Sequence, residues 1–121
     1  MKTIIILEKC LQFSVRVVKL AEFLETKKQK IFANQILRSG TSIGANVAES
    51  KYAASDADFI NKLKIAEKEA CETEYWLRVL KMSEIIDERQ FDSIFADLEV
   101  ISKLLGAIVV TSKLKKSDKN S

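Results

Sequence analysis

Histidine and proline are both absent from the 121 residues, and glycine occurs only three times. A chain this poor in turn-forming residues is unsuited to an all-β sandwich or barrel and favours a few long helices. The absence of histidine removes the commonest general base, the commonest zinc ligand and any Ser-His or Cys-His pair. The two cysteines, Cys10 and Cys71, form neither a CxxC pair nor a disulfide framework. We therefore expect a reduced, cytoplasmic protein in which both thiols are buried and inert.

Long apolar runs are also missing from the sequence. The run Ile4–Leu7 stops at Glu8 with no cleavage site after it, and the run Leu104–Val110 is only seven residues long. A membrane-spanning helix needs about 20 apolar residues. The sequence therefore predicts a soluble protein with no targeting segment and no membrane partner.

An excess of one charge is confined to the end of the chain. The 20 basic and 17 acidic residues give a net charge of +3. Residues 113–121 hold four lysines and one aspartate, so they carry this whole excess and leave residues 1–112 neutral. This distribution does not indicate a globally basic nucleic-acid binder, but a basic tail and local basic patches remain.

Apolar residues, 47% of the chain, recur at helical spacing in four segments. Rows that start at Ile6, Phe32, Phe59 and Phe91 repeat in steps of four and three, the spacing of one buried helix face. The first segment has a second apolar row, from Leu7 onward, which leaves room for a further partner. Suitable helix caps are present in Asp87, paired with Gln90, and in Ser55 or Asp56. The expected helices span about residues 4–25, 29–53, 56–82 and 88–114.

These helices have similar lengths and short connections. That pattern predicts an all-α protein, an antiparallel up-down-up-down four-helix bundle that forms one domain over residues 1–114. Residues 115–121 are expected to form a basic flexible tail.

Two glycines lie inside the second expected helix. Each of Gly40 and Gly44 costs about 1 kcal/mol relative to alanine there, so we expect a packing seam where another helix approaches closely. A phosphate-binding loop is a poor alternative, because the GK[ST] ending and a preceding strand are both missing.

Polar side chains beside the core rows of the second and third helices predict an internal hydrogen-bonded network. Its expected members are Arg38, Ser39, Ser42, Asn46, Glu49, Glu69, Glu72 and Thr73. Glu49, Glu69, Glu72 and Glu99 also suggest a di-metal bundle, but such sites need Glu-x-x-His pairs. We therefore expect no metal, no cofactor, no catalytic residue and no enzymatic activity.

Basic residues form two groups that could contact phosphates. The first comprises Lys27, Lys28, Lys30 and Arg38, and the second comprises Lys113, Lys115 and Lys116. An up-down bundle places the lysines of the two groups at opposite ends. Two interpretations stay open: solvated charge that only confers solubility, or a nucleic-acid contact surface. No aromatic residue interleaves these lysines, so base stacking is not expected there.

Three stretches carry a resemblance to a known family: QILRSGTSIGANVAE at 35–49, DFINKLKIA at 58–66 and KEACETEYWL at 68–77. They strongly resemble the signature of bacterial four-helix-bundle proteins first noticed as products of intervening sequences in large-subunit ribosomal RNA genes. The resemblance extends over about residues 7–114. It implies an antiparallel bundle that assembles as a ring-like homopentamer, and the family has no known catalytic residues.

A related branch includes the accessory protein of diversity-generating retroelements, which binds nucleic acid and a reverse transcriptase through a basic pentamer surface. The resemblance therefore implies a non-enzymatic accessory protein that binds nucleic acid, structured RNA above all, through basic surfaces repeated in a homo-oligomer. The alternative is a structural protein–protein adaptor that binds no nucleic acid.

Overall fold

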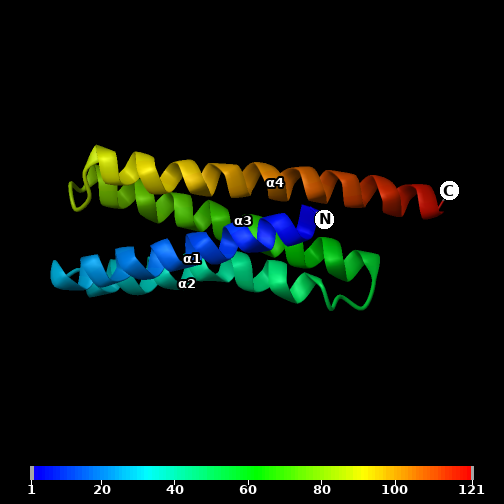
Figure 1. Ribbon diagram of the computed structural model, residues 1–121, viewed down its shortest axis with the longest axis horizontal. Coiled ribbons are helices and arrows are strands. Elements are labelled where there is room, and N and C mark those ends of the chain that lie inside the picture. Colours follow the sequence, from blue (N-terminus) through cyan, green and yellow to red (C-terminus); the bar gives the residue numbers. More distant parts are fainter. Residues whose placement is uncertain (1, 121) are drawn as a thin grey trace.

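The computed structural model describes residues 2–120, which form four antiparallel α-helices joined by short turns (Figure 1). The helices are α1 (Lys2–Thr26), α2 (Lys30–Ser50), α3 (Asp56–Met82) and α4 (Glu88–Asn120). Each helix packs against the next in the chain, and α4 packs against α1. The predicted all-α four-helix bundle is confirmed.

The two ends of the bundle differ in what they contain. One end holds the α1–α2 and α3–α4 turns, and we call it the turn pole (Figure 1). The other end holds the α2–α3 turn and the last turns of α4, and we call it the C-terminal pole. At 1.5 Å per residue, the 21 residues of α2 separate the two poles by roughly 30 Å.

Side-chain caps fix where α3 and α4 begin. The Ser55 hydroxyl accepts a hydrogen bond from the Asp58 amide at 3.1 Å, which satisfies one free donor of the first turn of α3. At the start of α4, the Gln90 amide donates to Asp87 Oδ1 at 2.7 Å, and the Asp87 amide donates to Gln90 Oε1 at 2.9 Å. This reciprocal pair is the predicted capping box.

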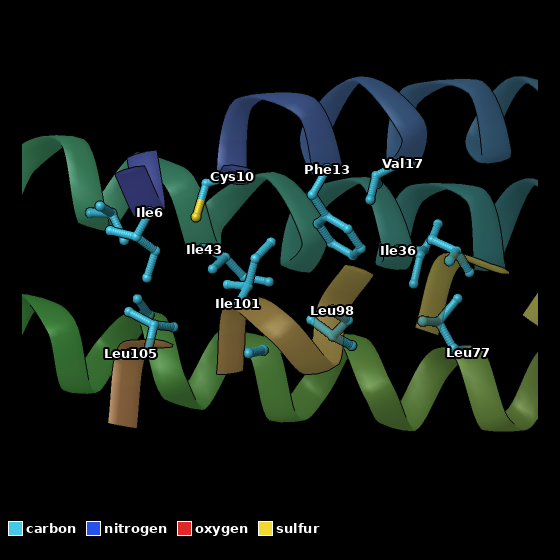
Figure 2. Close-up of a cluster of buried hydrophobic side chains, with 14 of the residues drawn as sticks. Ile6, Cys10, Phe13, Val17, Ile36, Ile43, Leu77, Leu98, Ile101 and Leu105 are labelled. Carbon is cyan, nitrogen blue, oxygen red and sulfur yellow. The ribbon is translucent and has the colours of Figure 1, made fainter. Parts of the chain in front are cut away.

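The core consists of the apolar rows predicted from the spacing. Figure 2 shows side chains of all four helices, among them Phe13, Ile43, Leu77 and Leu98, in the interior of the bundle. These four side chains are at most 1% exposed. The row of α4 is buried along its whole predicted length, from Phe91 to Ile108.

The glycine seam of α2 packs against α1. A Cβ on Gly40 would lie 2.8 Å from both Cγ atoms of Val17, and a Cβ on Gly44 would lie 2.9 Å from Cys10 Cβ. Both distances are shorter than van der Waals contact allows, so these two positions admit no side chain without movement of α1. The two glycines therefore allow the close approach of α1 and α2.

Residues 115–120, which were expected to belong to a flexible tail, continue α4 as far as Asn120. No proline or glycine follows Leu114 to end the helix. Lys119 Nζ also lies 3.0 Å from Asp56 Oδ2, so an ion pair holds this end of α4 against the start of α3. Ser121 lies outside the described residues.

The expectation that both thiols are buried is wrong for one of them. Cys10 is buried, and its burial raises the pKa of the thiol to about 12, but Cys71 is exposed on α3 because it lies one position beyond the buried row. In the second apolar row of α1, Leu11 is 61% exposed and Val18 is 41% exposed. No helix among residues 2–120 is long and apolar enough to span a membrane.

Candidate nucleic-acid interface

Ion pairs on the long sides of the bundle offset the charge of several basic residues. Arg16 is the best-anchored cation: it contacts Asp97 and also donates to the backbone oxygen and the hydroxyl of Ser93, at 3.1 and 2.8 Å. The pairs along the sides are Arg16–Asp97 (2.6 Å), Arg38–Glu69 (3.4 Å), Lys62–Glu49 (3.6 Å) and Arg78–Glu74 (2.9 Å).

Arg38 is held by carboxylates of α3. Its guanidinium donates to Glu72 and, at 3.4 Å, to Glu69 Oε2, while Trp76 Nε1 donates to Glu72 Oε2 at 3.0 Å. The bond to Glu72 raises the pKa of Arg38, and the bonds from Trp76 and Arg38 lower the pKa of Glu72. Two carboxylates thus offset the charge of Arg38, which makes it a weaker candidate for phosphate contact than the lysines.

A second polar contact joins α2 to α3 inside the core. The hydroxyls of Ser39 and Thr73, both fully buried, lie 3.1 Å apart, and Thr73 also donates to the Glu69 carbonyl at 2.8 Å. Among the described residues, no buried side-chain nitrogen or oxygen lacks a hydrogen-bond partner. The Ser39–Thr73 contact therefore satisfies polar groups that burial would otherwise penalise.

The other expected network members lie apart from these contacts. Ser42 donates to the Arg38 carbonyl and Asn46 donates to the Ser42 carbonyl, so both bond within α2. The Glu49 carboxylate forms an ion pair with Lys62 of α3, with Oε1 and Nζ 3.6 Å apart. The structure thus brings together Arg38, Ser39, Glu69, Glu72 and Thr73, and leaves Ser42, Asn46 and Glu49 outside that group.

The carboxylates do not converge as a metal site would require. Within residues 2–120, no group of three or more histidine, cysteine, aspartate or glutamate side chains is placed to hold a metal ion. Glu69 and Glu72 face Arg38, and Glu49 faces Lys62.

The first lysine group lies at the turn pole. Lys27, Lys28 and Lys30 are exposed around the α1–α2 turn, where Lys28 adopts a left-handed conformation with φ of 60°. No carboxylate of the described chain lies within ion-pair distance of these three lysines. The same pole nevertheless contains the acidic residues Glu25, Glu84, Asp87 and Glu88. These four acidic residues offset the charge of the three lysines.

The second lysine group makes the C-terminal pole the more basic end. Lys113 and Lys115 are exposed and Lys116 is half-buried, and no carboxylate in the described part of the chain pairs with any of them. Lys51, at the end of α2, and Lys119 add two further cations that the predicted site residues did not include. The up-down topology is the signal that could have placed Lys51 beside the others.

The described residues thus form a four-helix bundle with a basic C-terminal pole and several ion-paired cations along its sides. The chain belongs to the 23S rRNA-intervening sequence protein family, whose pattern matches residues 2–107. A crystal structure of a protein of unknown function from the S23 ribosomal protein family of Bacteroides thetaiotaomicron is 52% identical, with a TM-score of 0.88. That match covers 90% of this chain and 98% of the other.

A comparison with curated proteins finds no match. Neither the description of the family nor that of the Bacteroides protein names an enzymatic activity.

Proposed function

We propose that this chain is a non-enzymatic accessory protein that binds structured RNA through the lysines of its C-terminal pole. The supporting observation is that Lys113, Lys115 and Lys116 lie together at one end with no carboxylate partner among the described residues, whereas Arg16, Arg38, Lys62 and Arg78 on the bundle's sides are each paired with a carboxylate. Lysines at the turn pole add a weaker second surface. Family membership agrees with an RNA-related role.

The mode of binding follows from the side chains available at the pole. Lysine ammonium groups neutralise phosphates without reading bases, so binding is tolerant of sequence and steeply dependent on salt. One subunit presents few cations. Repetition of the C-terminal pole around a rotation axis would link several weak sites, and linked sites gain avidity without new contacts.

A homo-oligomer, with a pentamer favoured, is part of the proposal. The exposed side chains Ile4 (61%), Leu11 (61%), Val15 (59%) and Val18 (41%) form one stripe along α1, which we call the α1 apolar stripe. These positions are spaced by seven, four and three residues and so lie on one face of the helix. A second subunit could cover this stripe, since exposed apolar stripes mark interaction surfaces. Light scattering measures the assembly directly.

The first experiment asks whether RNA binds at all. Fluorescence anisotropy of a labelled RNA hairpin at low salt should show saturable binding to the purified protein. Simultaneous charge reversal of Lys113, Lys115 and Lys116 to glutamate should weaken it strongly, because the pole then repels phosphate. Absence of binding by the unmodified protein at low salt would contradict the proposal.

The α1 apolar stripe also favours a second candidate function, a protein–protein adaptor. Pull-down from a lysate with and without nuclease separates the two. Partners that are lost after nuclease treatment support RNA binding. Protein partners that persist at the same yield after nuclease treatment favour the adaptor.

A further inference from the structure

A hollow of about 530 Å³ lies at the C-terminal pole, between the start of α1, the first turns of α3 and the end of α4. Ile60 and Ile108, both less than 10% exposed, and the half-buried Phe59 supply its apolar part. Lys115 and Lys116 line it from α4. Its volume falls in the range of small-molecule sites, roughly 300–1,000 Å³.

The charge of this hollow is positive. Asp56 is the acidic residue in its lining, and Lys119 Nζ pairs with Asp56 Oδ2 at 3.0 Å. The charges of Lys115 and Lys116 are then left without a carboxylate partner among residues 2–120. Since the neighbouring surface is apolar, an anion beside these two lysines is screened less than on an open surface.

Hydroxyl groups complete the lining. Thr3 of α1 and Ser112 of α4 both face the hollow and can each donate a hydrogen bond to an oxygen of a bound anion. The ring of Phe59, half-exposed beside them, offers a surface on which a flat group can stack. Cations, hydroxyls and an aromatic ring within one hollow match a phosphate attached to a nucleoside.

The charge of the ligand distinguishes a strand end from a strand interior. A phosphate monoester carries about −1.5 to −2 at neutral pH, whereas an internal phosphodiester carries a single charge. Two unpaired lysines match the monoester better. We propose that the hollow binds a nucleoside phosphate monoester, as at the phosphorylated end of a nucleic-acid strand, with its phosphate against Lys115 and Lys116 and its base on Phe59; this inference rests on the proposed function.

The test compares one RNA hairpin with a single-stranded overhang in two forms, with a terminal phosphate or with a terminal hydroxyl, by anisotropy. The phosphorylated RNA should bind about tenfold more tightly, as expected for one added charge-assisted contact. The advantage should shrink as pH falls through about 6, where the monoester loses its second charge. Equal affinities for the two RNAs would overturn the end site while leaving RNA binding in place; no binding of either would overturn both.

Variants and competitors assign the effect to this hollow. The double variant Lys115→Gln/Lys116→Gln should abolish the preference for the phosphorylated end, whereas Lys103→Gln, an exposed position on the same helix, should keep it. Thermal melting checks that both variants fold. Adenosine 5′-monophosphate should compete with the phosphorylated RNA better than inorganic phosphate, and adenosine should not compete. Equal competition by inorganic phosphate would overturn the role of Phe59.

A last comparison distinguishes the two sources of the ligand. Competition by the mononucleotide at micromolar concentration assigns the site to free nucleotides as well as strand ends. Competition only at millimolar concentration assigns it to strand ends, whose neighbouring phosphates add contacts. Persistence of the end preference in the double variant would contradict the proposal in either case.

Discussion

Gly44 of α2 lies directly over Cys10 of α1: a Cβ at position 44 would come within 2.9 Å of Cys10 Cβ. The clashing atom is a Cβ, which is bonded directly to the backbone of α1, so movement of a flexible side-chain end cannot relieve the clash. The approach of α1 to α2 is thus set by the missing side chain. This explains why α2 tolerates a glycine that weakens its helix.

Gly44→Leu should lower the free energy of unfolding by about 1–3 kcal/mol, because the added side chain forces the two helices apart. Gly44→Ala should also destabilise. The matched control is Gly106→Ala on α4, where the new Cβ meets only Glu67 Oε2 at 3.9 Å. That change should stabilise by up to about 1 kcal/mol through helix propensity. Chemical denaturation measures the free energy of unfolding of all three variants. A change of the same sign for Gly44→Ala and Gly106→Ala would contradict the packing seam.

Thr73→Val should destabilise the fold by about 1–3 kcal/mol, because it leaves the buried Ser39 hydroxyl without its partner on α3. The double variant Ser39→Ala/Thr73→Val removes both groups and should cost less than the sum of the two single changes. Urea denaturation of the four proteins in the cycle measures the coupling. Strict additivity would show that the two hydroxyls do not interact.

The Arg38–Glu72 contact predicts a pH dependence of stability. The bonds from Trp76 and Arg38 lower the pKa of Glu72 from its usual 4.5, so the folded state favours the ionised carboxylate. The resulting stabilisation is present above pH 4.5 and is lost as pH falls through the lower folded pKa. The stability difference between the unmodified protein and Glu72→Gln should therefore shrink below that pH. Urea midpoints that differ by a constant amount from pH 7 to pH 3 would contradict this.

The α1 apolar stripe predicts the effect of charge on assembly. Leu11→Glu/Val18→Glu should convert the proposed oligomer to monomers of 13.7 kDa without loss of helicity, because both side chains face solvent within one subunit. Ile31→Glu, a change of an exposed aliphatic residue on α2, should leave the mass unchanged. Light scattering coupled to size exclusion measures the mass. A monomer already formed by the unmodified protein would contradict the oligomer.

Local periodicity was sufficient to predict the helices, because burial of one face imposes steps of three and four on each segment. The end of α4 could not be predicted in this way. It is lysine-rich and has no apolar row, and it contacts the start of α3 through Lys119 and Asp56, which lie 63 residues apart in the sequence. A contact of that separation leaves no mark in local spacing.

The candidate site, too, could be predicted from the sequence only in part. The lysine groups were evident as clusters in the sequence, but their electrostatic surroundings depend on the packing between helices. Arg38 pairs with carboxylates 31 and 34 residues away, and the turn pole gains acidic neighbours from the α3–α4 turn. The three-dimensional arrangement adds which acidic residues lie beside each lysine group.

The salt dependence of RNA binding tests the central claim most directly. The slope of log affinity against log salt concentration counts neutralised phosphates, at about 0.9 per contact on a duplex. The triple variant Lys113→Gln/Lys115→Gln/Lys116→Gln should lower both the affinity and the slope, and it should do so more than the matched triple variant at Lys27, Lys28 and Lys30. If the slope is unchanged in the C-terminal variant, its lysines do not contact phosphate and the proposed RNA-binding surface is wrong.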